Sequence, residues 1–165
     1  MEIRQVQTKT EIAEVARLAR TIWEEHFTPI IGPEQVAYML DRFQSEAAIA
    51  SQIENGFHYF AALEAGEAVG YGAVKPEGNT AFLSKLYVRR DRRGQGTGRA
   101  MLDYVESLAL EHGAERIRLT VNRHNRIAID AYLRWGFAIT DEQVADIGGG
   151  FVMDDYVMER VVGGS

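Results

Sequence analysis

Residues 83–99 read Leu83-Ser84-Lys85-Leu86-Tyr87-Val88-Arg89-Arg90-Asp91-Arg92-Arg93-Gly94-Gln95-Gly96-Thr97-Gly98-Arg99. An apolar run ends in a group of arginines, three glycines follow at alternate positions, and residues with helical periodicity come next. This order predicts a strand, a glycine turn and the start of a helix. Glycine allows positive φ and a close approach of the backbone to a ligand, and the first N–H groups of a helix point outward without an internal partner. The segment therefore predicts a site for an anion, most often a phosphate.

The charge distribution supports a small polyanion as the ligand. The chain has a net charge of −6, yet residues 89–99 hold five arginines and one aspartate, a local charge of +4. The other residues therefore sum to −10. A nucleic-acid surface normally spreads its positive charge over a whole face, so we expect no nucleic-acid partner.

Other glycine motifs do not fit the register of this turn. A dinucleotide-binding fingerprint that starts at Gly94 needs Gly or Ala at position 99, which is Arg99. A P-loop needs the triplet Gly-Lys-Ser/Thr, and the sequence contains none. Taken alone, the segment also remains compatible with a glycine-rich turn that binds nothing.

Two blocks carry a resemblance to a known family. Residues 93–98, Arg93-Gly94-Gln95-Gly96-Thr97-Gly98, resemble the (Gln/Arg)-x-x-Gly-x-(Gly/Ala) signature of the GNAT superfamily of N-acetyltransferases. Residues 122–137, Asn122-Arg123-His124-Asn125-Arg126-Ile127-Ala128-Ile129-Asp130-Ala131-Tyr132-Leu133-Arg134-Trp135-Gly136-Phe137, resemble its second signature. The blocks have the order and spacing of this superfamily, and the resemblance covers about residues 69–137. Both blocks are also similar to those of bacterial polyamine (spermidine/spermine) acetyltransferases.

Local patterns predict the elements of an α+β fold. We expect a mixed, mostly antiparallel twisted sheet with helices on both faces, as in the GNAT architecture, and one domain over residues 1–165. Residues 1–57 would form the first strand and the acceptor-site helices, 58–140 the acetyl-CoA-binding core, and 141–165 a C-terminal loop and strand. Strands are expected at 2–6, 58–63, 68–74, 80–88, 116–121, 137–140 and 151–161, and a loop at 141–150. Helices are expected from Thr10 to a break at Thr28-Pro29, and at 33–43, 46–54, 97–112 and 125–135.

Composition narrows the classes of protein further. The chain has 165 residues, 46% of them hydrophobic and 25% charged, which suits one folded domain. It contains no cysteine, so disulfides, thiolate metal sites and an acetyl-cysteine intermediate are excluded. The four histidines have no metal-ligand spacing, and we expect no metal. No apolar run approaches the length of a membrane span, and the N-terminus lacks the apolar stretch of a signal peptide. We therefore expect a cytoplasmic protein without a membrane partner.

The resemblance implies that an acetyl group passes directly from acetyl-CoA to a primary amine. It places the pyrophosphate on the backbone amides of 94–99, beside the side chain of Arg93. It places the pantetheine arm along Leu86, Tyr87 and Val88, with the thioester carbonyl at a backbone N–H near Leu86. The implied cofactor contacts are therefore Leu86, Tyr87, Val88, Arg93, Gly94, Gln95, Gly96, Thr97, Gly98, Arg99, Asn122, Asn125, Ala128, Tyr132 and Arg134. As bare residues, the two asparagines also suit helix N-caps, and Arg134 suits an exposed surface.

The resemblance also assigns part of the acid–base chemistry. Tyr132 stands where this family has a tyrosine that protonates the leaving thiolate, although the residue alone reads as a core aromatic. Many relatives place a glutamate in the strand before the glycine turn, where this chain has Ser84-Lys85-Leu86. Candidate proton acceptors are therefore Glu24, Glu25 and His26, which could equally be a solvated helix end.

The resemblance places the acceptor site between two segments that here combine aromatic and acidic residues. These segments contribute Trp23 and Phe27, and Asp154, Asp155 and Tyr156. Carboxylates beside aromatic faces favour a cationic amine, so we hypothesise a polyamine or a similar small diamine as the acceptor. A protein or peptide N-terminus, and a CoA-binding regulatory module without catalysis, are the alternatives. Because residues 151–161 are apolar, the sequence also suggests a homodimer formed through this strand.

Overall fold

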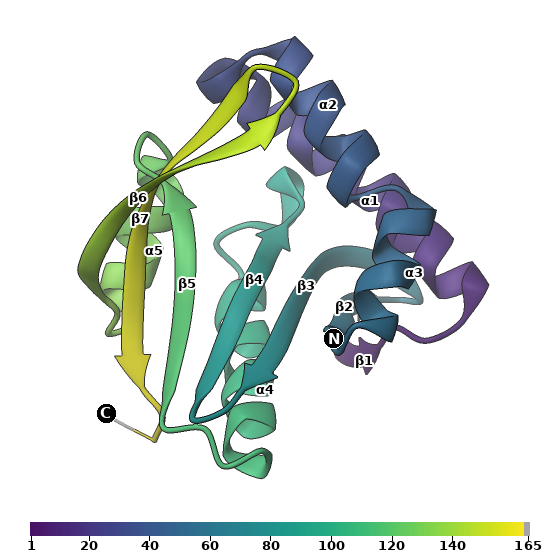
Figure 1. Ribbon diagram of the computed structural model, residues 1–165. Coiled ribbons are helices and arrows are strands. Elements are labelled where there is room, and N and C mark those ends of the chain that lie inside the picture. The colour runs from purple at the N-terminus through teal and green to yellow at the C-terminus, as the bar shows by residue number, and fades with distance from the viewer. Residues whose placement is uncertain (164–165) are drawn as a thin grey trace.

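The computed structural model describes residues 1–163, whose strands form one seven-stranded sheet. The strand order is β1-β2-β3-β4-β5-β7-β6, and neighbours are antiparallel except for the parallel pair β4–β5 (Figure 1). This confirms the predicted fold class. The strands are β1 (Glu2–Gln5), β2 (His58–Glu64), β3 (Glu67–Glu77), β4 (Thr80–Val88), β5 (Arg116–Asn122), β6 (Ala138–Gly148) and β7 (Phe151–Val161). The helices are α1 (Lys9–Ile31), α2 (Pro33–Phe43), α3 (Glu46–Glu54), α4 (Thr97–Glu111) and α5 (Arg126–Arg134), and a short 3-10 helix covers Arg90–Arg92.

Each face of the sheet has its own apolar core. Side chains alternate along a strand, so Phe60 and Ala62 of β2 pack on the α4 side, whereas Tyr59 and Ala61 pack against α1–α3. Helix α5 adds Ile129 and Tyr132 to the core on the α4 side. The helices thus cover both faces of the sheet.

Strands β4 and β5 separate after only four paired residues. Thr80 to Leu83 lie opposite Arg116 to Leu119, and beyond this point β4 pairs with β3 alone (Figure 1). The backbone of β4 from Ser84 to Val88 therefore has no strand partner on its β5 side. Unpaired strand edges bind extended ligands.

A bulge in β4 marks the point of separation. Ala73 pairs with Lys85 but Val74 pairs with Leu83, so Ser84 is an extra residue in the ladder. One extra residue reverses the alternation of side chains that follow it. Leu83 accordingly packs in the core on the α4 side. Tyr87 packs against the α1–α3 layer on the other face, and Lys85 points the same way, toward Gln52 of α3.

The predicted break of the first helix at Thr28-Pro29 is wrong. Helix α1 begins with a capping box made by Thr8 and Glu11 and continues through Pro29 to Ile31. Proline removes the N–H that would bind the carbonyl of Glu25, and the Arg90 guanidinium approaches that oxygen instead, at 3.5 Å. Gly32 caps the end of the helix with a φ of +88°, a conformation that glycine adopts without steric strain.

The predicted loop over 141–150 is also wrong. Residues 138–148 form β6, which pairs with β7 up to Gly148 opposite Phe151. Its polar residues are exposed, because β6 is an edge strand covered on neither face. The tip of the hairpin rests on α2, where the Tyr38 hydroxyl donates to the carbonyl of Ile147 at 2.9 Å (Figure 1). The hairpin therefore closes one side of the space above the separated strands.

The reason given for a homodimer does not hold. Strand β7 pairs with β5 on one side and with β6 on the other, so it offers no free edge to a second copy. The free edges of the sheet belong to β1 and β6. The other predicted helices and strands are present, with small differences at their ends.

Candidate active site

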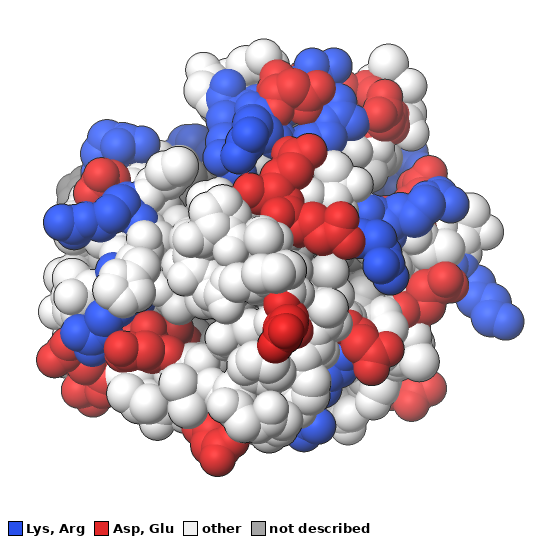
Figure 2. All heavy atoms as spheres, turned by 90° about the horizontal axis from the view of Figure 1, so that it is seen from above, with Lys and Arg blue, Asp and Glu red and all other residues white. Residues whose placement is uncertain are grey.

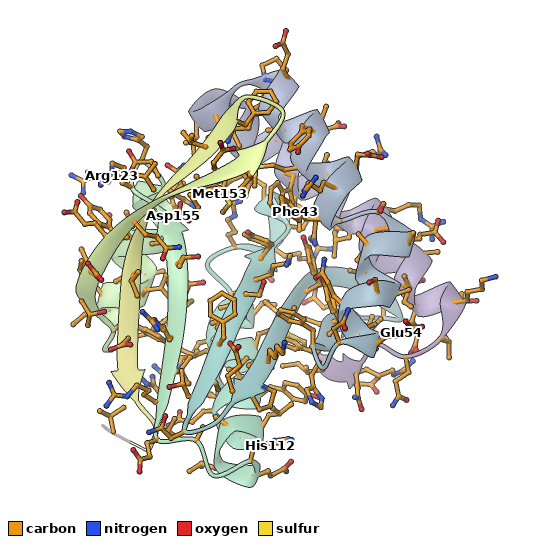
Figure 3. All side chains as sticks on the ribbon, in the orientation of Figure 1. Phe43, Glu54, His112, Arg123, Met153 and Asp155 are labelled. Carbon is orange, nitrogen blue, oxygen red and sulfur yellow. The ribbon has the colours of Figure 1, made fainter. Side chains whose placement is uncertain are left out.

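A cleft of about 720 Å³ lies where β4 and β5 separate. Helices α1, α2 and α5, the glycine turn and β7 complete its walls. Figure 3 shows Phe43 of α2 on one side of the upper end of β4 and Met153 and Asp155 of β7 on the other. The cleft runs from the turn at one end to α2 and the hairpin at the other, so two ligands can meet above β4.

The glycine turn has the backbone that the sequence predicted. Gly94 and Gly96 have φ of +78° and +82°, and Gly96 is the N-cap of α4. A Cβ on Gly98 would lie 3.0 Å from the Trp135 ring, so only glycine packs here without displacing that ring. The first amides of α4 have no carbonyl one turn earlier to bind. These observations fit a diphosphate held by backbone N–H groups.

Three arginines of the basic segment form ion pairs with carboxylates. Arg89 binds Glu67 and Asp91 at 2.7 and 2.6 Å, and Arg92 binds Glu64 at 2.7 Å. Arg99 similarly pairs with Asp103 at 3.3 Å. These carboxylates neutralise much of the positive charge that the sequence shows as an island.

Arg93 is the arginine of this segment whose guanidinium lies at the cleft beside uncharged partners. Its Nε donates to the carbonyl of Val88 at 3.3 Å, and a terminal nitrogen lies 3.4 Å from Nδ1 of His26. Burial and the nearby Arg90 lower the pKa of its guanidinium, which still leaves it charged. An anion in the turn would complete its coordination.

His26 connects three parts of the site. Because Arg93 can only donate, Nδ1 of His26 accepts, and Nε2 donates to Oδ1 of Asn125 at 2.9 Å. The same Oδ1 accepts from the amide of Ala128 at 3.4 Å and caps α5. Burial is the main cause that lowers the pKa of His26, so the ring is neutral at pH 7. Both ring nitrogens are occupied, which makes His26 a positioning residue.

Asp155 is the carboxylate that faces the cleft. It lies on β7 opposite Asn122 and is 2% exposed. Burial, and then the neighbouring Asp154, raise the pKa of this carboxyl to about 6. Asp154 points to the other face of the strand, where its Oδ1 accepts from Arg123 at 2.8 Å. Tyr156 also lies on that side, with the Arg123 guanidinium 5.0 Å from its ring centre.

Tyr132 lines the same cleft from α5. Its ring packs edge-on against Trp135 and Phe137, with centroids 5.8 and 5.4 Å away. Burial raises the pKa of its phenol, so the hydroxyl keeps its proton at pH 7. The cleft therefore holds a carboxyl that is ionised at pH 7 and a phenol that carries its proton.

Aromatic rings form the wall opposite β7. Trp23 lies 4.8 Å from Phe27 and 5.7 Å from Tyr87, measured between ring centroids. The indole N–H donates to the Tyr71 hydroxyl at 2.9 Å, and that hydroxyl donates to Gln44 at 2.6 Å. Buried polar groups with partners on both sides hold this wall in one position.

The structure brings most of the predicted site residues together and leaves some apart. Glu24 and Glu25 are exposed on α1 and do not line the cleft. Asp154, Tyr156 and Gln95 are also absent from its lining. Those that do line it are Trp23, His26, Phe27, Leu86, Tyr87, Val88, Arg93, Gly94, Gly96, Thr97, Gly98, Arg99, Asn122, Asn125, Ala128, Tyr132, Arg134 and Asp155. Lys85 lines it too, and only the Ser84 bulge could have indicated this.

Two other features are absent from residues 1–163: a metal-binding group of side chains and a membrane-spanning helix. No group of three or more His, Asp or Glu side chains there could hold a metal ion. None of the helices in that range is long and apolar enough to cross a membrane.

Comparisons with known proteins identify the family. The acetyltransferase (GNAT) family model matches residues 15–137, and the chain belongs to this family. An uncharacterized N-acetyltransferase of Mycobacterium tuberculosis is 29% identical over 153 residues, 92% of this chain and 97% of that protein. The spermidine N(1)-acetyltransferase of Thermoplasma acidophilum is 22% identical, over 93% of this chain and 96% of its own.

A solved structure supports the fold. The PaiA N-acetyltransferase of Thermoplasma acidophilum in complex with coenzyme A superposes with a TM-score of 0.81 at 21% identity, covering 98% of this chain and 99% of the other. The protein is thus an N-acetyltransferase that uses acetyl-CoA.

Proposed function

We propose that Asp155 accepts the proton of the incoming amine and that Tyr132 protonates the leaving thiolate. The observation that carries this assignment is the presence of both side chains in one cleft, beside the unpaired edge of β4. An alkyl ammonium holds its proton at neutral pH and must lose it before the nitrogen can attack. A carboxyl with a pKa near 6 is ionised at pH 7 and is a stronger base than an exposed aspartate.

The remaining residues bind and orient the cofactor. Bound acetyl-CoA supplies the thioester as acyl donor. The turn from Gly94 to Arg99 holds its diphosphate, Arg93 adds a charged donor, and the free edge of β4 pairs with the pantetheine arm. A backbone N–H near Leu86 polarises the thioester carbonyl. The amine nitrogen then bonds to the acetyl carbon and the carbon–sulfur bond breaks. Tyr132 protonates the departing thiolate, and the second proton that the nitrogen loses on forming the amide restores the phenol.

A cationic acceptor such as a polyamine is the acceptor hypothesis that the sequence raised. Asp155 and the rings of Trp23 and Phe27, which line the same cleft, support it, and so does the likeness to a spermidine acetyltransferase. Of the four carboxylates expected around the acceptor, however, Glu24, Glu25 and Asp154 lie outside the cleft. A peptide N-terminus, which also presents a primary amine, is the second candidate, and an assay across amines separates the two.

The proton-acceptor role is tested by Asp155→Asn, with Asp154→Asn as the matched control. We expect Asp155→Asn to lower kcat by roughly 10²- to 10⁴-fold, because a general base contributes about that much. Its affinity for acetyl-CoA should stay unchanged. Asp154→Asn should keep kcat within about threefold, since Asp154 pairs with Arg123 outside the cleft. Equal losses in the two variants would show that the effect is structural.

A further inference from the structure

Lys85 is a lysine of the cleft lining that the proposed mechanism does not use. The Ser84 bulge turns its side chain toward α3, where Nζ donates to Ser84 Oγ at 2.8 Å and lies 3.5 Å from Oε1 of Gln52. Among the ion pairs of residues 1–163, Lys85 takes part in none. Its ammonium thus has neutral hydrogen-bond partners and no counter-charge.

The surroundings of this ammonium are aromatic. Nζ lies 6.0 Å from the ring centre of Phe57 and 5.9 Å from that of Tyr59. Burial lowers the pKa of Lys85 to about 8, which leaves the group mostly protonated at pH 7. Holding an unpaired ammonium in such surroundings costs free energy, and a bound anion recovers it.

The position of Lys85 decides which ligand can supply the anion. Arg93 and Arg99, which also line the cleft, belong to the glycine turn after β4, where the diphosphate is assigned. Residues 86–88, assigned to the pantetheine arm, lie between that turn and Lys85. Lys85 therefore lies beyond the thioester end of the arm, where Gln52 connects it to the carbonyl of Phe43 at the end of α2.

We propose that Lys85 binds an anionic group of the acceptor, so that the preferred acceptor is a small molecule carrying both a primary amine and a carboxylate or phosphate. This inference rests on the proposed function, because it orients the acceptor between Lys85 and Asp155. In this orientation the Asp155 carboxylate faces the amine of the acceptor, and the Lys85 ammonium faces its anionic group. A polyamine, with positive charge along its whole length, would place one cation against Lys85.

Matched acceptor pairs test the inference on the unmodified protein. L-lysine and 1,5-diaminopentane differ by a carboxylate, and lysinamide keeps the shape of lysine without that charge. Phosphoethanolamine and ethanolamine form the corresponding phosphate pair. We expect kcat/KM, measured by release of CoA thiol, to be roughly 10- to 100-fold higher for the anionic member of one pair, as for a hydrogen-bonded charge. Whichever pair shows the preference identifies the anion. Equal or faster turnover of the member without the anion in both pairs overturns the inference.

Lys85→Met tests whether this lysine is the cause, and Lys75→Met is the matched control. Lys75 also lies over the Phe57 ring, at 5.4 Å, but does not line the cleft. We expect Lys85→Met to raise KM for the preferred anionic acceptor by roughly 10- to 100-fold, with kcat nearly unchanged, and to remove the preference over the partner that lacks the anion. Lys75→Met should change none of them.

The other outcomes are distinct. An equal fall of kcat on both members of a pair would make Lys85 a proton carrier and overturn the anion site. Unchanged constants in Lys85→Met would overturn it as well. If Asp155→Asn keeps its kcat while Lys85→Met loses the anion preference, the proposed proton acceptor fails and the anion site stands. If no amine accelerates thiol release, both proposals fail.

Discussion

The chemistry of the cleft depends on where single side chains point. Asp154 and Asp155 are adjacent in sequence, yet β7 directs one to Arg123 on the surface and the other into the cleft. Burial that raises the pKa of Asp155 to about 6 also makes the charged carboxylate costly for the fold. The folded state binds this proton more tightly than the unfolded chain does. The contribution of Asp155 to the free energy of unfolding therefore falls as pH rises through about 6. The protein thus keeps a destabilising group where the reaction needs a base.

His26 offers a second prediction at this scale, because its ring joins Arg93 to the cap of α5. We expect His26→Ala to raise KM for acetyl-CoA several-fold, since Arg93 loses a partner that fixes its position, and to leave kcat within about fivefold. Steady-state kinetics with each substrate varied in turn measures both constants. A loss of kcat of roughly 10² or more, with KM unchanged, would return His26 to the role of proton acceptor.

Elements place these side chains by small departures from regular geometry. The Ser84 bulge turns Lys85 and Tyr87 to the acceptor side, and the turn at Gly94 and Gly96 ends β4 and opens α4. Both departures occur within one strand and its exit. Bulges and positive-φ glycines commonly mark functional sites for this reason.

Gly96→Ala tests the turn, and Gly66→Ala is its control. The two glycines have nearly the same φ, +82° and +81°, and a Cβ at either meets no atom within 4 Å. Both variants should therefore lose a similar stability, about 1 kcal/mol, seen as a lower Tm. Only Gly96→Ala should weaken acetyl-CoA binding in calorimetry, because Gly66 lies in the β2–β3 turn away from the cleft. Equal acetyl-CoA affinity in the two variants would argue against a diphosphate at this turn.

The sequence predicted the elements whose signals are local. The glycine turn and the helical periodicity that follows it in α4 are each contained in a few neighbouring residues. The strand expected at 137–140 is the start of β6, but its continuation over residues 141–148 was missed. The stability of that part comes from pairing with β7, while its own side chains are mostly exposed. The Ser84 bulge depends on the partner strand β3 and leaves no mark in β4 alone. The positions of Lys85 and Asp155 in the cleft follow from these two long-range features.

The whole molecule arranges two layers around one gap in a sheet. The α4–α5 layer carries the turn and Tyr132, the α1–α3 layer carries the aromatic wall, and the β6–β7 hairpin brings Asp155 across to meet them. Seen from above, charged side chains gather in several mixed clusters around a broad uncharged area (Figure 2). Within the basic segment of the sequence, carboxylates pair with Arg89 and Arg92, whereas Arg93 turns inward to the cleft.

The pH dependence of kcat in the unmodified protein and in Asp155→Asn tests the central claim most directly. Asp155 must be ionised to take a proton, so kcat should rise with pH through an apparent pKa near 6 in the unmodified protein. The variant should lack this acidic limb while retaining its acetyl-CoA affinity. An acidic limb that persists in Asp155→Asn with the same midpoint would contradict the assignment of Asp155 as the proton acceptor.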